Sequence, residues 1–209
     1  MKNKFIAVEG NIGSGKTSLS TKLSKDFNSE LILEAFAENP FLPKFYENPK
    51  KYGFSLELFF MAERYHQLKN KWVEDLFFPS KISDYFFMKS KIFATTNLKS
   101  DELLLFNRLF DIMLSSLPHP NLLIYLHANT DRLQENIKKR GRDFELDIKE
   151  DYLKSIENSY FDYLKKQSKF PALILDVSDV DFIENHAIYA KIKSLIYKDY
   201  DIGLHHISI

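Results

Sequence analysis

The chain has 209 residues, of which 44% are hydrophobic, 28% charged and 15% aromatic, a composition typical of a globular protein with a substantial core. Lysine plus arginine equals aspartate plus glutamate at 29 each, so the basic excess of general nucleic-acid binders is missing and we expect no nucleic-acid partner. The lack of cysteine excludes disulfides, thiolate metal sites and cysteine nucleophiles.

Targeting and membrane signals are also missing from the sequence. No apolar run reaches the roughly 18 residues that a bilayer span requires, and residues 1–4 lead into a strand-like segment without a signal-peptide core. We therefore expect a cytoplasmic protein without a membrane partner. Because the chain has no internal repeat or long linker, we expect residues 1–209 to form a single domain.

In the first half of the chain, short apolar runs alternate with helical patterns. The expected elements are, in chain order, a strand at 5–9, a helix from Thr17, a strand at 31–33, a long helix at 55–77 that includes Trp72, and a strand at 82–86. Two Asn-Pro pairs interrupt the segment before the long helix.

The second half continues the same alternation. The expected elements are a helix over 101–116 capped by Ser100-Asp101, a strand at 122–126, a helix capped by Asn129-Thr130 that reaches the basic cluster 138–142, a helix at 149–166, a strand at 172–177 and a helix at 182–196. His205 and His206 are expected in a solvated tail with no metal role. The pattern predicts an α/β fold with a parallel sheet covered on both faces, and ligands at the carboxyl ends of its strands.

The most specific motif follows the first predicted strand. The run Gly10-Asn11-Ile12-Gly13-Ser14-Gly15-Lys16-Thr17 fits the P-loop pattern at every fixed position. Its glycines let backbone N–H groups point at phosphate oxygens, Lys16 is expected to reach the β- and γ-phosphates, and the Thr17 hydroxyl is expected to hold Mg²⁺. The motif predicts ATP binding and phosphoryl transfer, and binding without turnover is the alternative.

A kinase must also hold and deprotonate its acceptor. Glu34 ends the second predicted strand, where it is either the base for an acceptor hydroxyl or a solvated loop acid. Asp84 ends the third strand-like run and either assists Mg²⁺ or the acceptor, or lies in a surface turn.

Two further pairs of residues each allow one structural and one functional interpretation. Glu57 and Arg64 are seven residues apart on the long helix, so they share a face and form either a buried ion pair or two polar groups in a pocket. Arg140 and Arg142 either stabilise phosphate charge or simply end a basic helix.

Together these residues resemble the deoxynucleoside kinase family over about residues 4 to 166. The resemblance is carried by GNIGSGKT at 10–17, YENPKKYGFSLELFFMAERY at 46–65 and KKRGRDFELDIKEDYL at 138–153. It implies a P-loop NTPase-like three-layer α/β/α fold with a five-stranded parallel sheet and a short lid. It also implies transfer of the ATP γ-phosphoryl group to the 5′-hydroxyl of a deoxyribonucleoside.

The resemblance further implies roles by position. Glu34 matches the family's 5′-hydroxyl base, although Ala35 stands where the family usually has proline. Tyr46 and Glu145 match the residues that share the sugar 3′-hydroxyl, and Arg64 matches an arginine near the base. Arg140 and Arg142 match arginines of the lid that closes over the phosphates.

Three positions depart from the family pattern. Glu57 stands where the family reads the base with glutamine, and an ionised carboxylate only accepts hydrogen bonds, which leans toward an amino-bearing base, adenine, cytosine or guanine. Ser83-Asp84-Tyr85 replaces a Glu-Arg-Ser motif, so Asp84 is expected to support Mg²⁺ while the arginine has no clear replacement. Asn136 replaces a third lid arginine.

The sequence therefore predicts a deoxynucleoside kinase that uses ATP and Mg²⁺, with deoxyadenosine or another amino-bearing deoxynucleoside as substrate. Phe60 or Phe86 is expected to stack on the base. A thymidylate-type monophosphate kinase is the nearest alternative, and a non-enzymatic nucleotide switch is the alternative of another class. The resemblance also implies a homodimer, for which the helices around 55–77 and 101–116 are candidate contacts.

Overall fold

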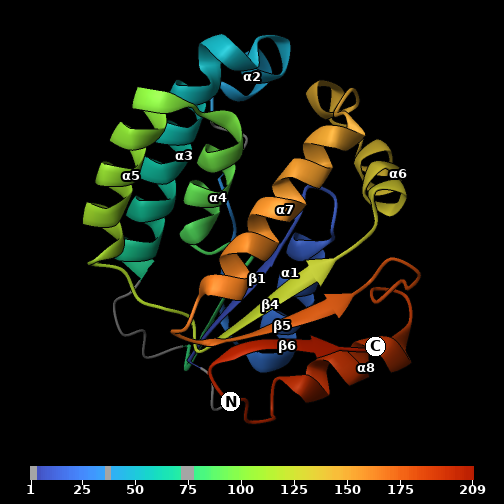
Figure 1. Cartoon of the computed structure of the whole chain (residues 1–209). Helices are drawn as coiled ribbons and strands as arrows, with labels where there is room; N and C mark the ends of the chain where they lie inside the picture. The colour runs from blue at the N-terminus through green and yellow to red at the C-terminus, as the bar shows by residue number, and fades with distance from the viewer. Residues whose placement is uncertain (1–3, 36–38, 72–77) are drawn as a thin grey trace.

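The computed structural model describes residues 4–35, 39–71 and 78–209. Its centre is a parallel sheet of six strands in the order β2-β3-β1-β4-β5-β6 (Figure 1). The strands are β1 (Phe5–Gly10), β2 (Glu30–Ile32), β3 (Lys81–Ser83), β4 (Leu122–His127), β5 (Pro171–Asp176) and β6 (Gly203–Ile207). Within the described ranges, no helix has the length and apolar character needed to cross a membrane.

Helices cover both faces of this sheet and make the expected three-layer α/β/α arrangement (Figure 1). They are α1 (Lys16–Phe27), α2 (Leu42–Glu47), α3 (Pro49–Lys71), α4 (Met88–Asn97), α5 (Ser100–Leu114), α6 (Thr130–Arg140), α7 (Glu150–Lys166) and α8 (His186–Leu195), with a 3₁₀ turn, η1, at Asp143–Glu145. The helices α3, α4, α5 and α7 lie over one face, and α1 and α8 lie over the other.

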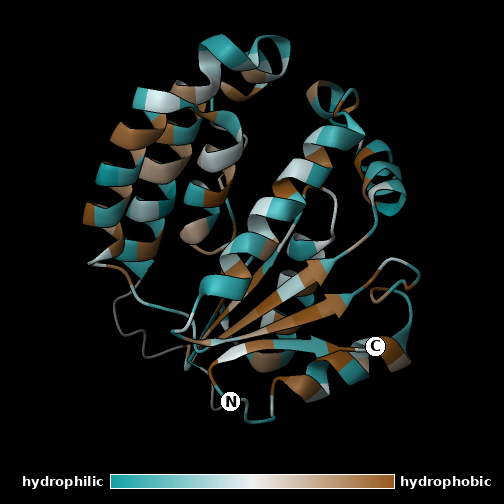
Figure 2. Ribbon diagram, in the orientation of Figure 1, coloured by the Kyte–Doolittle hydropathy of each residue, from teal (hydrophilic) through white to brown (hydrophobic). Residues whose placement is uncertain are grey.

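The alternation of side chains along the strands builds two separate cores. In β1, Phe5 and Ala7 point into the cluster with α3, α4, α5 and α7, whereas Ile6 and Val8 point into the cluster with α1 and α8. All four side chains are completely buried. The inner strands β4 and β5 are accordingly mostly hydrophobic (Figure 2), as expected for a parallel sheet that is covered on both sides.

The sheet has six strands and not the predicted five, because β6 adds an edge strand beside β5. His205 and His206 were predicted in a solvated tail, and they lie in β6. The tail pairs with β5 because its apolar side chains have places on both faces of the sheet: Leu204 packs against the α3-side core and Ile207 against the α1-side core.

Several helices and strands also begin or end at residues other than those predicted. The long helix α3 begins at Pro49, a favourable first helical residue, while residues 72–77, with Trp72, lie outside the described residues. The strand predicted at 82–86 ends at Ser83, and α4 begins soon after it. The helix predicted from Phe182 begins at His186, because the Asn185 side chain caps it by accepting from the N–H groups of Ala187 and Ile188.

Helix caps were predicted with mixed success. Asn129 caps α6 as expected, with its side chain accepting a hydrogen bond from the Arg132 N–H. Ser100 is not the cap of α5: that position is Lys99, whose side chain makes no capping hydrogen bond.

The order of the strands places the phosphate loop at a switch point of the sheet. β1 lies between β3 and β4: the connection that leaves β1 runs to β2 on one side, and the connection that leaves β3 passes β1 to reach β4 on the other side. Crevices at the carboxyl ends of strands form where the order reverses in this way. The residues after Gly10 therefore open into such a crevice.

Candidate active site

The phosphate loop connects the end of β1 to the start of α1. Gly13 and Gly15 have φ angles of 83° and 87°, a left-handed conformation that glycine adopts readily. A Cβ on Gly15 would lie 2.8 Å from Phe182 Cζ, and one on Gly13 would lie 2.6 Å from the carbonyl oxygen of Leu133. The loop therefore curls tightly around the N-terminus of α1, where backbone N–H groups favour a phosphate.

Lys16 is the first residue of α1, and its ammonium donates a hydrogen bond to the carbonyl oxygen of Asn11 at 2.8 Å. Burial, together with the nearby charge of Lys89, lowers the pKa of Lys16 to about 8. The negative charge of a polyanionic ligand would oppose both effects and favour the charged form of Lys16.

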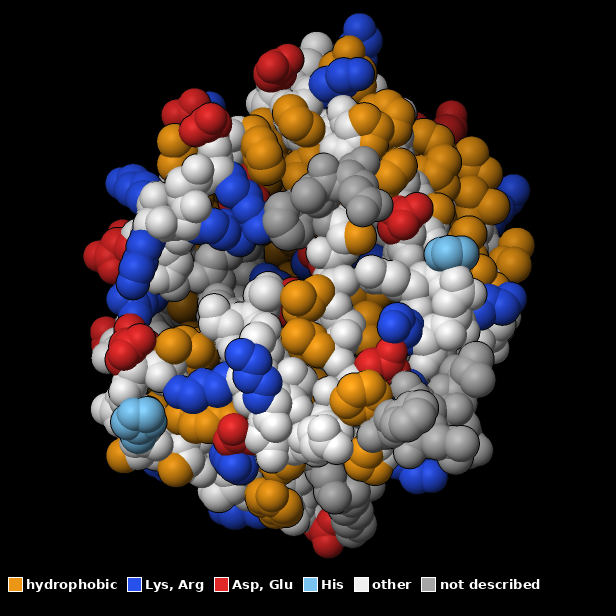
Figure 3. All heavy atoms as spheres, turned by 180° about the vertical axis from the view of Figure 1, so that it is seen from behind, with side chains coloured by type: hydrophobic (Ala, Val, Ile, Leu, Met, Phe, Trp, Pro, Cys, Tyr) orange, Lys and Arg blue, Asp and Glu red, His pale blue; other side chains and the backbone are white. Residues whose placement is uncertain are grey.

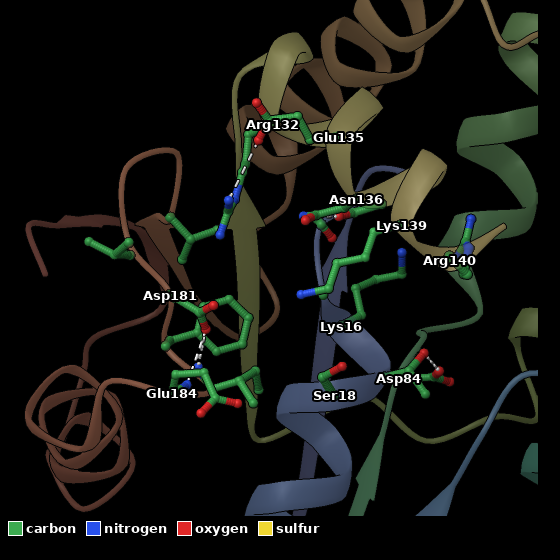
Figure 4. A pocket seen from close by; sticks show the side chains of 18 of the residues that line it. Lys16, Ser18, Asp84, Arg132, Glu135, Asn136, Lys139, Arg140, Asp181 and Glu184 are labelled. Carbon is green, nitrogen blue, oxygen red and sulfur yellow. Dashed lines mark hydrogen bonds and ion pairs between the residues drawn. The ribbon is translucent and has the colours of Figure 1, made fainter. Parts of the chain in front are cut away.

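A cavity of about 650 Å³ opens in front of the phosphate loop. Figure 4 shows Lys16 and Lys139 pointing into it, with Arg132 and Glu135 paired at 3.6 Å near its rim. Its walls come from the loop, from α6 and from the segment before α8, and include Gly15, Arg132, Lys139, Arg140, Asp181 and Phe182. The cavity thus combines the phosphate loop and several cationic side chains with one aromatic side chain, Phe182.

A second, smaller cavity of about 100 Å³ lies beyond the first, between α3, α4 and α7. Six residues line both cavities, and all six were predicted site residues: Lys16, Thr17, Glu34, Asp84, Arg140 and Arg142. The two cavities therefore meet at a junction that holds the phosphate loop, two acids and the two lid arginines.

Glu34 sits at this junction between two cations. Arg64 donates from Nε to Glu34 Oε1 at 2.8 Å, and Lys89 Nζ lies 2.6 Å from Glu34 Oε2. Burial alone would raise the pKa of Glu34, but Lys89 and Arg64 outweigh it and hold that pKa well below its usual range. Glu34 is therefore a fixed carboxylate that accepts hydrogen bonds, and not a solvated loop acid.

Asp84 links Glu34 to the phosphate loop. Thr17 Oγ1 donates to Asp84 Oδ2 at 2.5 Å, and the backbone N–H of Glu34 donates to Asp84 Oδ1 at 2.8 Å. Only 5% of the Asp84 side chain is exposed, so the surface-turn alternative is wrong. A hydroxyl and a carboxylate in contact offer the hard oxygen ligands that Mg²⁺ prefers.

Glu57 and Arg64 share a face of α3 as predicted, but they do not pair within the described part of the chain. Arg64 donates to Glu34 and to Ser90 Oγ, while Glu57 Oε1 accepts from Asn97 Nδ2 at 2.7 Å. Both side chains line the smaller cavity. Of the two predicted alternatives, the structure therefore has two polar groups in a pocket and not an ion pair between Glu57 and Arg64.

The lid residues lie at the other end of the smaller cavity. Gly141 ends α6 in the left-handed conformation, and the flanking Arg140 and Arg142 both contact the buried carboxylate of Glu145. Tyr46 stacks on Phe144, with ring centroids 6.0 Å apart. Burial, and then the charge of Glu145, raise the pKa of Tyr46, so its hydroxyl stays a neutral donor and acceptor.

Comparison with known proteins identifies the family of this chain. The family model for deoxynucleoside kinases matches residues 6–200. The chain belongs to the deoxynucleoside kinase family. It is 37% identical over 203 residues to the deoxyguanosine kinase of Bacillus subtilis (strain 168), covering 92% of this chain and 97% of that protein. It is 30% identical to the deoxyadenosine/deoxycytidine kinase of the same organism, with 88% and 87% covered.

A solved structure of this kinase family shares the fold. The deoxyadenosine kinase from M. mycoides with bound dATP superposes with a TM-score of 0.76 at 26% identity, covering 92% of this chain and 99% of that one. The protein is thus a deoxynucleoside kinase, an enzyme that phosphorylates a deoxyribonucleoside. The roles of its individual residues remain predictions.

Some site residues of this kinase were missed in the sequence. Lys89, Phe93 and Asn97 all lie on α4, which no sequence pattern predicted, and the first two line the smaller cavity. The signal for Lys89 was faint: a lysine five residues after Asp84, in a segment that otherwise reads as apolar.

Two other predictions need correction or completion. Phe60 and Phe93 line the smaller cavity, but Phe86 does not face it: Phe86 is fully buried and packs edge-on against Phe170 in the core. Asn136, at the position of a missing lid arginine, donates from Nδ2 to the Gly13 carbonyl at 2.8 Å and so ties α6 to the phosphate loop.

Proposed function

We propose that this kinase transfers the γ-phosphoryl group of Mg·ATP to the 5′-hydroxyl of a deoxyribonucleoside with an amino-bearing base. The observation that carries the proposal is the junction of the two cavities, where phosphate-loop, acidic and lid residues meet. The large cavity has room for the donor nucleotide, and the smaller one for the head of the nucleoside. Such an arrangement supplies the positioning and charge stabilisation on which phosphoryl transfer depends.

Mg²⁺ fits the oxygen atoms at the junction. Thr17 and Asp84 would hold it together with the donor phosphates, since Mg²⁺ commonly takes only one or two protein ligands in kinase sites. When bound, it neutralises charge on the phosphates.

Glu34 would accept a hydrogen bond from the 5′-hydroxyl and aim that oxygen at the γ-phosphate. Its lowered pKa makes it a weak base early in the reaction. A loose transition state places little demand on early proton removal, so orientation comes first and the proton leaves late. Arg140 and Arg142 would then turn from Glu145 toward the transferring group.

Binding of the nucleoside would use the residues around the smaller cavity. Tyr46 and Glu145 would hold the 3′-hydroxyl, which favours a deoxyribose with that group free. Glu57 and Arg64 would face the base, and Phe60 would stack on it. Deoxyguanosine and deoxyadenosine are the substrates named for several relatives, which supports a purine substrate.

We also propose a homodimer that forms through α5. Leu104, Leu105 and Ile112 lie on one stripe of α5 and are 55%, 48% and 71% exposed. Figure 3 shows hydrophobic side chains gathered at the corresponding right-hand edge, while acidic and basic groups are interspersed elsewhere on that face. An apolar helix stripe of this kind is typical of a surface that a second copy covers.

The test is ADP formation from Mg·ATP with each of the four deoxynucleosides and with thymidine monophosphate. We expect a purine deoxynucleoside to stimulate turnover, and Glu34→Gln to lower kcat by about a hundredfold. Phosphorylation of the monophosphate alone would refute the acceptor assignment. If ATP binds but none of these acceptors stimulates turnover, the proposed transfer to a nucleoside is refuted.

A further inference from the structure

Glu57 places a carboxylate in the smaller cavity next to a group of apolar and aromatic side chains. Its side chain is 1% exposed and lines the smaller cavity beside Leu56, Phe60, Phe93 and Tyr152. Aromatic side chains beside a buried polar group suit a planar ligand that is recognised at its edge. The inference below rests on the proposed function, in which that ligand is the base of the nucleoside.

One oxygen of this carboxylate has no partner. Glu57 Oε1 accepts from Asn97 Nδ2, whereas Glu57 Oε2 is buried and makes no hydrogen bond to any described residue. Arg64, seven residues further along the same helix, is engaged with Glu34 and Ser90. A buried polar atom left unsatisfied in this way calls for a partner, and a ligand in the cavity can supply one.

The two protonation states of Glu57 offer different patterns to such a ligand. The ionised carboxylate presents acceptors only, which matches the adjacent N1–H and N2 amine donors of guanine. The protonated carboxyl presents one O–H donor and one acceptor. Because Oε1 already accepts from Asn97, the proton belongs on Oε2, which then donates to N1 of adenine while Oε1 accepts from the N6 amine.

We propose that Glu57 determines the base preference of this kinase through its proton, its ionised form selecting deoxyguanosine and its protonated form selecting deoxyadenosine. The same carboxyl thus serves two purines that present opposite hydrogen-bonding groups at position 1.

The surroundings of Glu57 keep both forms accessible near neutral pH. Burial raises the pKa of Glu57 to about 7, with Arg64 and Asn97 opposing that shift. The other ionisable groups that act on Glu57 or are acted on by it come from α2, α4, α7 and the segment after β2, and they are Tyr46, Lys89, Tyr152 and Glu34. The pKa values of both tyrosines are raised, so they stay neutral from about pH 6 to about pH 8.5.

The decisive experiment is internal competition. Equal deoxyguanosine and deoxyadenosine are supplied with saturating Mg·ATP, and the ratio of the two monophosphate products is measured between about pH 6 and about pH 8.5. Effects of pH on the phosphate site, or on Glu34, cancel in this ratio because both nucleosides use them. We expect the ratio of deoxyguanosine to deoxyadenosine product to rise at least about tenfold over this range.

The amide variant provides the matched control. In Glu57→Gln, Asn97 continues to donate to the side-chain oxygen, which leaves the amide nitrogen facing the cavity as a permanent donor. We expect a ratio near the low-pH value of the wild type and independent of pH. Glu102→Gln, at an exposed acid in the first turn of α5, should retain the wild-type dependence.

Calorimetry supplies a readout that does not depend on turnover. At about pH 7, titrations in buffers with different ionisation enthalpies should show proton release when deoxyguanosine binds and proton uptake when deoxyadenosine binds, and Glu57→Gln should abolish both. A product ratio that changes less than about threefold in the wild type, or proton exchange of the same sign for both nucleosides, overturns the proposal.

These outcomes separate this proposal from the proposed function. If neither nucleoside is phosphorylated, the proposed function fails. If both are phosphorylated and their ratio stays flat across pH, the kinase assignment stands and only the role of the Glu57 proton fails.

Discussion

Lys89 and Arg64 hold opposite oxygens of the Glu34 carboxylate, with Lys89 Nζ 2.6 Å from Oε2 and Arg64 Nη2 2.6 Å from Oε1. Neither oxygen can rotate away without losing a buried ionic contact. The Glu34 carboxylate is therefore held in one orientation, and that orientation depends on α3 and α4 together.

The first prediction concerns Lys89. Lys89→Met should lower kcat by about ten- to a hundredfold, because Glu34 loses one of its two anchors and the acceptor hydroxyl is no longer aimed. Lys89→Arg should recover part of this loss, while Lys91→Met, at a more exposed lysine on the same helix, should behave as wild type. Equal loss in Lys89→Met and Lys89→Arg would contradict an orienting charge.

A second prediction concerns the lid. Arg140→Lys keeps the charge but loses the planar fork that can bind two phosphate oxygens at once. We expect kcat to fall by about a hundredfold or more while the KM for ATP changes little, since the contact strengthens in the transition state. Lys138→Met, in the same basic helix end, is the control. A change confined to the KM for ATP would indicate ground-state binding only.

A third prediction follows from the buried Glu57. Its pKa is raised from 4.5 to about 7, so the folded protein holds the Glu57 proton more tightly than the unfolded chain does. The stability from this group is complete below about pH 4.5 and is lost as the pH rises through 7, a change on the order of 3 kcal/mol.

Urea unfolding of wild type and Glu57→Gln at about pH 5 and about pH 8 measures this change. Relative to wild type, the variant should have a larger free energy of unfolding, and so be more stable, at about pH 8 than at about pH 5. If that difference between the two proteins is the same at both pH values, Glu57 does not titrate in this range.

A fourth prediction addresses the α5 stripe. Ile112→Glu places a charge at the most exposed position of the stripe, where it would be desolvated in a dimer. Light scattering should show a dimer for the wild type and a monomer for the variant. Glu102→Gln, on the same helix, should leave the dimer intact. A wild-type monomer at the concentrations used for kinetics would refute this contact.

How much of the site was predictable depended on how local each signal was. The phosphate loop was readable because its chemistry is contained in eight consecutive residues, and the lid arginines flank one glycine. The partner of Arg64 was not readable, because helical spacing reports which residues share a face and not what lies opposite. The Arg64 guanidinium pairs with Glu34, which lies on another segment.

In the fold, too, elements with a local sequence signal were predicted and elements that depend on distant residues were missed. Unbroken apolar runs predicted β1, β4 and β5, which are buried on both faces. β6 was missed because an edge strand tolerates polar residues such as His206, and only its pairing with β5 makes it a strand. α4 was missed because its apolar residues spread around the helix, so no clear amphipathic stripe appears.

The position of β1 in the sheet has a kinetic consequence. β1 pairs with β3 and β4, so Phe5 must meet Lys81 and Ile6 must meet Leu122 across long stretches of chain. Such distant pairings slow folding because the entropy of large loops is lost before the contacts form. β1, which leads into the phosphate loop, therefore reaches its native pairing only when most of the chain has folded. Partly folded molecules should be unable to bind nucleotide, and nucleotide added during refolding should stabilise the finished enzyme without speeding its formation.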